Sequence, residues 1–401
     1  MNRMLKNITT IIFVVTLVGC SILSGGSTNT ASNIASKISK NYTIPVSYNT
    51  AYTYRTDTPL LNLKSIPQNI DSLRASNPDE YVKQVVEIIN KNAKNDFEKV
   101  KMAHDVVALL VKYDAANFWA GTVPDQSYRT VLKNRLAVCE GYSNTLKKFC
   151  DVLNILCDKV TGFGRGVGTS PLAGDTPNDA NHAWNIVTIN NESYLIDCTW
   201  DSGFMDGKVS KQAYTTDWLF LKPEHFLYTH YPKNTKQQLL ETPFTAAQFS
   251  TLPFFKPKFF ELADNLSVDL KKINQVNNNL SFNYTTKDGY RLSFTINDIK
   301  TGRGIQNSTY AQTDGSKETA YFTFPSAGQY SVNIFWWKTG VQRGEGCGEF
   351  VVEASSASTV QYPTTYSSSS KNLQIISPLE MPLKKGNTYL FKIRVDNKKV
   401  V

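Results

Sequence analysis

The 401-residue chain is poor in side chains suited to covalent or metal chemistry, with only six cysteines and four histidines. No two cysteines form a CxxC pair, so we do not expect a zinc site. A mechanism that needs both a thiol and an imidazole therefore has few candidate residues. Hydrophobic residues make up 41 % of the chain, which excludes a wholly disordered protein, and the length suits two or three domains.

Concentrated basic runs are also lacking. Lys and Arg outnumber Asp and Glu by 43 to 34, for a formal net charge of +9, but they are dispersed along the chain. A protein that binds single-stranded nucleic acid would interleave basic and aromatic residues along a groove, and the sequence has no such stripe. The charge is compatible with an acidic polymer as partner, yet we interpret it as a solubility property and expect no nucleic-acid partner.

The first 20 residues are typical of a secretory signal. Basic Arg3 and Lys6 precede an apolar core at 11–18, which is shorter than the roughly 20 residues of a membrane-spanning helix. No other stretch of the sequence is long and apolar enough to span a bilayer. We therefore predict that residues 1–19 are a signal peptide.

The signal ends in the sequence LVGC, which resembles the bacterial lipobox. This resemblance implies cleavage before Cys20, a lipid on the Cys20 sulfur and a membrane-anchored lipoprotein of the cell envelope that faces outside the cytoplasm. In the alternative, an ordinary export signal is removed and Cys20 is incidental. Small polar residues dominate the stretch that follows, so we expect residues 20–50 to be a flexible tether.

Two helices are expected ahead of the middle of the chain. Asn77 and Pro78, followed by two acidic residues, form a helix start, and a second helix begins near Asn95. His104 lies on the apolar stripe of the second helix. We interpret it as a packed core residue rather than a catalyst.

A third helix carries a thiol at its N-terminus. Its apolar stripe consists of Tyr142, Leu146, Phe149 and Leu153. Asn154 is expected to end the helix, because Asn tolerates positive φ. Cys139 lies three residues before the stripe, on the same face, where unpaired N–H groups and the helix dipole favour a thiolate. Cys139 is therefore a candidate nucleophile, whereas a cysteine buried in mid-helix would be inert packing.

Two strands joined by Asn190 and Asn191 carry the other polar candidates. Asn accepts the positive φ of a type I′ turn, so this loop predicts a hairpin in which paired residue numbers sum to 381. In that register Asp197 is the same-face diagonal neighbour of His182, whereas a one-residue bulge would put the two on opposite faces. If the register holds, Asp197 can orient His182 toward Cys139, the arrangement used in acyl-transfer enzymes.

Three sequence blocks around these residues resemble the core of the transglutaminase-like superfamily. The blocks are RLAVCEGYS at 135–143, NHAWN at 181–185 and YLIDCTWD at 194–201. They occur in order, with 43 residues from Cys139 to His182 and 15 from His182 to Asp197. Segments downstream, at 217–218, 223–226, 230–232 and 238–240, resemble the kyphoscoliosis-peptidase branch of the superfamily.

The resemblance implies a papain-like α+β fold with Cys139 as nucleophile, His182 as base and Asp197 as orienter. Together with the predicted export signal, it implies an exported thiol enzyme that acts on amide bonds of proteins or peptides through a thioester, and the peptidase branch favours hydrolysis. A cross-linking acyltransferase shares the first half-reaction, and a surface scaffold that has lost catalysis is the non-enzymatic alternative. Tissue-type transglutaminases carry acidic calcium loops that this sequence lacks, so we expect no metal and no cofactor.

Other side chains near these motifs receive lesser roles. Gln126 and Tyr128 are candidate oxyanion donors beside the backbone N–H of Cys139. His225 and His230 are interpreted as structural.

After Phe260 the pattern changes to short segments that alternate apolar and polar residues. The expected strands are 280–286, 290–297, 320–325, 329–337 and 348–353. They predict an immunoglobulin-like β-sandwich, with Asp288-Gly289 as a hairpin turn between the first two strands. The predicted division beyond the tether is a catalytic domain at 51–258, the sandwich at 259–354, and a Ser-rich linker with a short β segment at 355–401.

Overall fold

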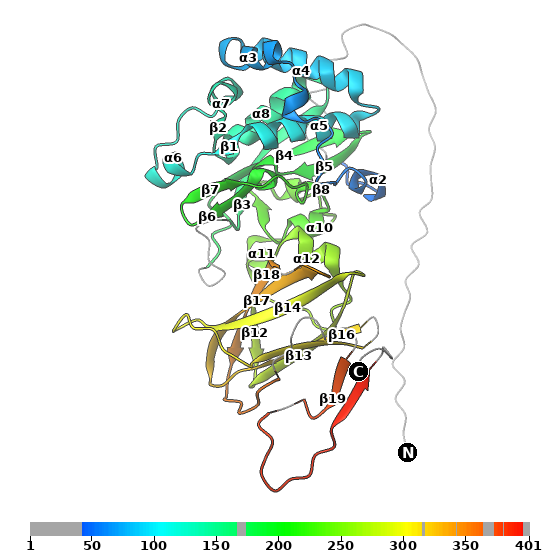
Figure 1. Ribbon diagram of the computed structural model, residues 1–401. Helices are drawn as coiled ribbons and strands as arrows, with labels where there is room; N and C mark the ends of the chain where they lie inside the picture. Colours follow the sequence, from blue (N-terminus) through cyan, green and yellow to red (C-terminus); the bar gives the residue numbers. More distant parts are fainter. Residues whose placement is uncertain are drawn as a thin grey trace, which may run out of the picture. The chain divides into compact units, whose positions relative to one another are not determined.

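The computed structural model describes residues 42–166, 174–314, 317–341, 343–363, 373–379 and 381–395 (Figure 1). The predicted signal peptide, Cys20 and most of the predicted tether lie outside these residues. No helix in the described part of the chain is long and apolar enough to cross a membrane. The predicted α+β class is confirmed, because a region of mixed helices and strands is followed by a large, mainly antiparallel β region.

Most helices belong to the mixed region, and side-chain caps set the starts of the longest ones. The helices are α2 (Asn49–Tyr52), η1 (Leu63–Ser65), α3 (Gln68–Ser76), α4 (Pro78–Asn92), α5 (Asp96–Leu110), α6 (Ala115–Ala120), α7 (Tyr128–Asn134), α8 (Cys139–Val152), α9 (Cys198–Ser202), α10 (Pro223–Phe226), η2 (Thr235–Gln238), α11 (Ala246–Thr251) and α12 (Pro257–Leu262). The Asn77 side chain accepts a hydrogen bond from the third residue of α4, and Asn95 does the same for α5. Both predicted helix starts are confirmed.

The mixed region contains a five-stranded antiparallel sheet with the order β8-β5-β4-β3-β9. Its strands are β3 (Leu156–Gly164), β4 (His182–Ile189), β5 (Glu192–Ile196), β8 (Leu219–Leu221) and β9 (His230–Pro232). Asn190 and Asn191 have φ of 52° and 65°, and β4 pairs with β5 so that Ile186 faces Leu195. The hairpin and its predicted register are therefore confirmed.

Helix α8 packs on this sheet through its predicted apolar stripe. The Tyr142, Leu146 and Phe149 side chains have no exposed surface, and Asn154 has φ of 59° just beyond the helix. Because α8 contacts β4, the helix that begins with Cys139 lies against the strand that begins with His182.

Two short ladders complete the mixed region. β1 (Lys112–Tyr113) pairs in parallel with β2 (Leu136–Ala137), and β6 (Gly203–Asp206) pairs antiparallel with β7 (Val209–Gln212). The parallel ladder joins the end of α5 to the residues just before Cys139, so it helps to fix the start of α8.

The β region is a sandwich of two sheets around an aromatic-rich core. The first sheet contains β10 (Phe254–Phe255), β12 (Ile273–Val276), β14 (Tyr290–Asp298), β17 (Gly328–Lys338) and β18 (Glu345–Ala354). The second contains β11 (Ala263–Asp264), β13 (Asn279–Thr286), β15 (Thr309–Asp314) and β16 (Lys317–Thr323). The rings of Phe282 on β13 and Phe294 on β14 meet edge to face between the sheets, with centroids 5.9 Å apart.

The predicted hairpin at Asp288-Gly289 is wrong. β13 pairs with β16 and β14 pairs with β17, so the turn connects strands of opposite sheets. Alternation predicts that each strand has one buried face, but it does not distinguish a turn within one sheet from a turn between two sheets. β12 and β15 were not predicted from the sequence.

The last described strands are β19 (Leu373–Ser377) and β20 (Lys392–Val395), which pair with each other in a two-stranded sheet. Residues 364–372 of the predicted Ser-rich linker lie outside the described residues. The domain boundaries proposed from the sequence stay predictions.

Candidate active site

Cys139 is the first residue of α8 and is partly exposed. No side chain caps this helix, so the first N–H groups of α8 are left without a side-chain acceptor. Gln126 fixes the preceding turn, because its Oε1 accepts a hydrogen bond from the Val138 N–H over 2.9 Å while its Nε2 donates to the Pro124 carbonyl over 2.9 Å. Tyr128, the other candidate oxyanion donor, directs its hydroxyl to Asp79 instead.

The His182 ring contacts two polar side chains and several aromatic rings. Its Nε2–H donates to Asp197 Oδ2 over 2.7 Å, and the Cys139 side chain is near enough to the ring to contribute to its raised pKa. The indole of Trp200 stacks on the imidazole, with centroids 5.1 Å apart and 30° between the ring planes. The structure therefore brings together Cys139, His182 and Asp197, while the catalytic roles of these residues stay predictions.

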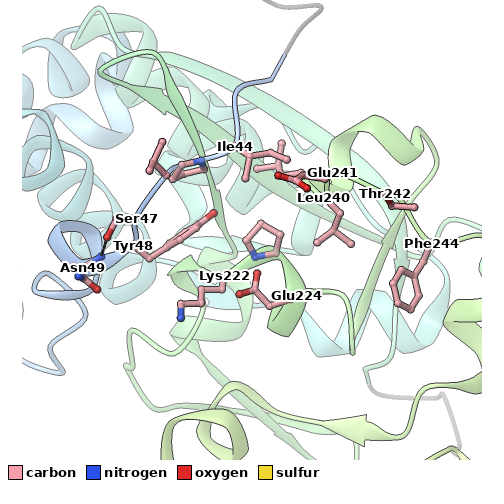
Figure 2. Close-up of a pocket in the computed structure, with 14 residues that line it drawn as sticks. Ile44, Ser47, Tyr48, Asn49, Lys222, Glu224, Leu240, Glu241, Thr242 and Phe244 are labelled. Carbon is pink, nitrogen blue, oxygen red and sulfur yellow. Dashed lines mark hydrogen bonds between the residues drawn. The ribbon is translucent and has the colours of Figure 1, made fainter. Parts of the chain in front are cut away.

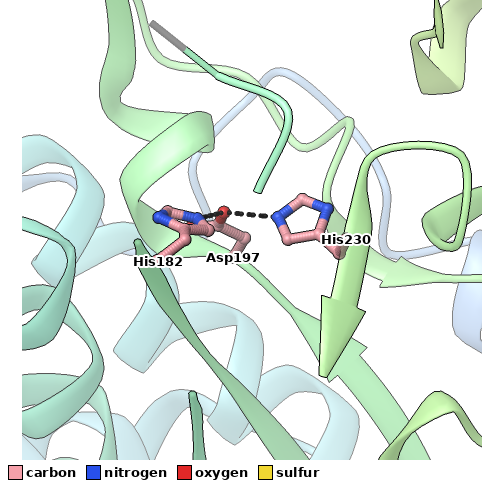
Figure 3. Close-up of side chains that lie close together, drawn as sticks. All are labelled: His182, Asp197 and His230. Atoms are coloured by element: carbon pink, nitrogen blue, oxygen red, sulfur yellow. Dashed lines mark hydrogen bonds and ion pairs between the residues drawn. The ribbon is translucent and has the colours of Figure 1, made fainter. Parts of the chain in front are cut away.

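Asp197 follows β5 and is the N-cap of α9. Each of its two carboxylate oxygens accepts two hydrogen bonds. Oδ1 accepts hydrogen bonds from the backbone N–H groups of Thr199 and Trp200 over 2.8 and 3.2 Å. Oδ2 accepts from Nε2 of His182 and Nε2 of His230, over 2.7 and 3.1 Å (Figure 3). Burial alone would raise the pKa of Asp197, but the two histidines outweigh it and hold that pKa below its ordinary value.

The two histidines on Asp197 have opposite protonation preferences. Burial disfavours a charged His182, but the charge and hydrogen bond of Asp197, together with Cys139, raise the pKa of His182 to about 10. Burial lowers the pKa of His230 to about 4 in spite of its hydrogen bond to the same carboxylate. At neutral pH His182 therefore holds a proton readily, while His230 stays neutral.

The contact between His230 and Asp197 was missed by sequence reasoning, which interpreted His230 as structural. His230 comes from β9, whose partner in the sheet is β3, and Gly164 lies opposite it in that ladder. Local periodicity does not predict such a long-range pairing. The one available signal was the place of His230 in the downstream segment that resembles the kyphoscoliosis-peptidase branch.

His182, Asp197 and His230 also form the one group in the described part of the chain whose donor atoms are spaced to hold a metal ion, all within 4.8 Å of one another. In the structure both imidazoles donate to the carboxylate, so the three side chains satisfy one another. The absence of a metal cofactor stays a prediction.

A second buried polar cluster joins α5 to α9. His104 Nε2 lies 3.0 Å from Asp201 Oδ2, and His104 Nδ1 lies 3.5 Å from Asp105 Oδ1. Lys101 Nζ contacts Asp105 at 2.5 Å, so positive and negative groups alternate through the cluster. The interpretation of His104 as a core residue is confirmed, because its side chain has no exposed surface.

The five described cysteines are all free. Cys150, Cys157, Cys198 and Cys347 are buried, and burial raises the pKa of the last three. A raised thiol pKa lowers the fraction of reactive thiolate at neutral pH, and burial keeps all four side chains from a substrate. Cys139, which is partly exposed, is therefore the reactive thiol candidate among them.

Figure 2 shows a pocket of about 550 Å³ that none of the three candidate catalytic residues lines. Its walls include Ile44, Tyr48, Leu240 and Phe244, with Lys222 and Glu224 among the charged residues. The candidate chemistry therefore belongs to the cluster at Asp197 and not to this pocket.

Comparison with known proteins agrees with the sequence motifs. Residues 83–198 match the family model of the transglutaminase-like superfamily. The kyphoscoliosis peptidase of Mus musculus is 27 % identical over 210 residues, which cover 50 % of this chain and 31 % of that protein. Cytokinesis protein 3 of Schizosaccharomyces pombe is 28 % identical over 130 residues, which cover 32 % and 14 %. A crystal structure of a TGase is 19 % identical with a TM-score of 0.24, over 37 % of each chain.

The chain spans less than a third of the length of these curated relatives. The resemblance seen in the three motif blocks is confirmed. The lipid anchor is not tested by these relatives.

Proposed function

Since residues 83–198 form a transglutaminase-like domain, we propose that the chain is a thiol enzyme that acts on amide bonds of proteins or peptides. Cys139 is the nucleophile, His182 the general base and acid, and Asp197 the orienting group. The observation that carries the proposal is the position of the His182 ring, which donates to Asp197 and lies near enough to the Cys139 side chain for that side chain to contribute to its raised pKa. A carboxylate, an imidazole and a thiol in this order are the parts of an activated nucleophile.

The chemistry proceeds in two half-reactions. The raised pKa of His182 favours the state in which the thiol proton of Cys139 is already on the imidazole, so Sγ attacks the substrate carbonyl carbon as a thiolate. The backbone N–H at the uncapped start of α8 is the donor we assign to the oxyanion. The C–N bond then breaks, His182 gives its proton to the leaving amine, and a thioester remains on Cys139. Water attacks the thioester with His182 again as base, which releases the acid and restores the thiol. Asp197 stabilises the protonated imidazole in each transfer.

Hydrolysis makes the enzyme a peptidase or amidase, and the kyphoscoliosis peptidases among its relatives support that outcome. An amine that resolves the thioester in place of water would make it a cross-linker. The test is mass spectrometry of glutamine-containing peptides incubated with the protein, with and without excess alkylamine. We expect two fragments that together gain one water, and no product with Cys139→Ala.

Amine incorporation without cleavage would reassign the enzyme as a cross-linking acyltransferase. Equal product from the wild type and from Cys139→Ala would overturn the proposed nucleophile. A folded wild type with no product from any peptide would favour the scaffold reading.

We propose that the enzyme is exported and anchored to a membrane of the cell envelope by a lipid on Cys20. The support is the sequence alone: a basic start, an apolar core and the LVGC segment. Labelling of cells with a radioactive fatty acid tests it directly. We expect label on the wild type and none on Cys20→Ser, and an unlabelled wild type would contradict the anchor.

A further inference from the structure

We infer that His230 is a positioning residue for the proposed enzyme, because its hydrogen bond holds Asp197 in the orientation that directs His182 toward Cys139. The inference rests on the proposed roles of Cys139 and His182. It adds a fourth side chain to the site, one that acts through Asp197 and not on the substrate.

Two histidines donate to the same oxygen of Asp197. Oδ2 accepts from His182 on β4 and from His230 on β9, over 2.7 and 3.1 Å. These donors come from different strands, so His230 further limits rotation of the carboxylate and does not move with the His182 imidazole. The other oxygen is held by the start of α9. His230 therefore completes the set of four hydrogen bonds that fixes this carboxylate.

The tautomer of His230 follows from its two neighbours. A carboxylate only accepts hydrogen bonds, so the ring proton of a neutral His230 lies on Nε2, and Nδ1 is left as an acceptor. The Thr229 hydroxyl lies 2.9 Å from Nδ1 and 3.2 Å from the Phe226 carbonyl oxygen, and its one proton can be donated to either acceptor. When it is donated to Nδ1, Thr229 favours the tautomer that donates to Asp197. Its backbone carbonyl is held in turn by the Arg165 N–H, over 2.8 Å.

Aromatic side chains enclose the His230 ring. Their centroids lie between 4.0 and 5.1 Å from the centroid of the imidazole, and they belong to Phe226, Trp200, Trp184 and Trp218. A phenyl ring would fill such an aromatic box as well as an imidazole does. What histidine adds at this position is the hydrogen bond to Asp197. The titratable groups that interact with this carboxylate are His182, His230, Tyr113, Tyr142 and the buried thiol of Cys198, and Cys139 interacts with His182.

The test compares two substitutions at one position. His230→Phe keeps the ring and removes the donor, while His230→Gln keeps an amide N–H at a similar reach. The readouts are the rate of Cys139 alkylation by iodoacetamide at fixed pH, and kcat and KM on a cleaved peptide. We expect His230→Phe to lower the alkylation rate and kcat by about tenfold or more with KM nearly unchanged, and His230→Gln to restore most of both.

A folded His230→Phe protein that alkylates and turns over like the wild type would show that His230 only packs, and would overturn the inference. Should His230→Phe not fold, Thr229→Val tests the same hydrogen bond between His230 and Asp197. It removes the hydroxyl next to Nδ1, whose donation favours the tautomer with the proton on Nε2. A slower alkylation of Cys139 is expected, and an unchanged rate would overturn the inference.

Alkylation of Cys139 requires no turnover of substrate. The experiments therefore test the proposed function and the role of His230 independently. If no peptide is cleaved by the wild type, the proposed function fails, and the alkylation rates of the variants still decide the role of His230. If peptides are cleaved and the variants match the wild type, only the role of His230 is lost.

Discussion

His104 Nε2 and Asp201 Oδ2 lie 3.0 Å apart with neither side chain exposed to solvent, although 97 residues separate them in the chain. Asp201 is on α9, and the N-cap of α9 is Asp197. The contact therefore ties the helix that begins at the candidate site to α5. Burial opposes the charged imidazole, but Asp105 and Asp201 together raise the pKa of His104 above its ordinary value.

Removal of the Asp201 carboxylate is expected to destabilise the protein strongly. Asp201→Asn leaves a buried His104 without its closest acidic partner, and loss of one member of a buried ion pair costs about 3–5 kcal/mol. The free energy of unfolding in urea measures the loss. Asp206→Asn on the exposed face of β6 is the matched control and is expected to change stability by less than about 0.5 kcal/mol. Equal stability of the two variants would contradict the structural role of Asp201.

The pair of His182 and Asp197 predicts a loss of stability at high pH. The pKa of His182 rises from 6.5 to about 10 on folding, so its stabilising contribution is complete below about pH 6.5 and is lost as pH rises through 10. The unfolding free energy of the wild type is expected to fall over this range, relative to His182→Gln, by an amount on the order of a few kcal/mol.

His225 supplies the control for this pH dependence. Burial lowers the pKa of His225 from 6.5 to about 4, so its ring is neutral in both the folded and the unfolded protein from about pH 7.5 to 10. The stability difference between the wild type and His225→Gln should therefore stay flat there. If the stability difference between the wild type and His182→Gln were also independent of pH, the His182 ring of the folded protein would not hold its proton in this range, which would contradict the prediction.

A single methyl group at Gly164 is expected to disturb His182. A Cβ at Gly164 would lie 2.9 Å from His182 Cβ and 3.0 Å from its Cγ, which is closer than ordinary contact, so the ring must shift. Gly164→Ala should slow alkylation of Cys139 by about tenfold or more. Gly174→Ala is the control, because nothing lies within 4 Å of the added carbon. The interpretation fails if both variants react at the wild-type rate.

Arg165 is expected to contribute more to stability than its neighbour Lys272, although both contact Asp175. The Arg165 guanidinium donates to Asp175 and to the backbone carbonyls of Tyr228, Phe249, Leu252 and Pro253. Arg165→Met leaves these buried acceptors without the donor and should cost about 3 kcal/mol or more. Lys272→Met removes its ion pair with Asp175, which keeps its hydrogen bonds from Arg165, and should cost less, roughly 1.5–3 kcal/mol. Urea unfolding of both variants tests the order, and a larger loss for Lys272→Met would reverse it.

Local features of this fold could be predicted from the sequence. Asn77 and Asn95 cap their helices, and Asn190 with Asn191 sets the hairpin register, because each acts through backbone groups within a few residues. The register then placed Asp197 near His182 by arithmetic. The cluster of Cys139, His182 and Asp197 was predictable to this extent.

Features that depend on long-range pairing could not be predicted. His230 reaches Asp197 only because β9 pairs with β3, and no local pattern encodes that partner. For the same reason we predicted that β13 and β14 pair in one sheet. Each strand does alternate buried and exposed residues as predicted, but the two strands lie in different sheets. The alternation of apolar and polar residues indicates which face of a strand is buried. Which strand lies beside it depends on packing across the whole core.

Strand β10 has only two residues, yet it limits how the β region could be exchanged between proteins. Phe254 and Phe255 pair with Glu349 and Gly348 of β18, and the Phe255 ring is buried in the sandwich core. A β module grafted onto another protein would need to carry Phe254 with it. A fusion that starts later would open a strand edge on β18 and remove a ring from the core, and both defects favour aggregation.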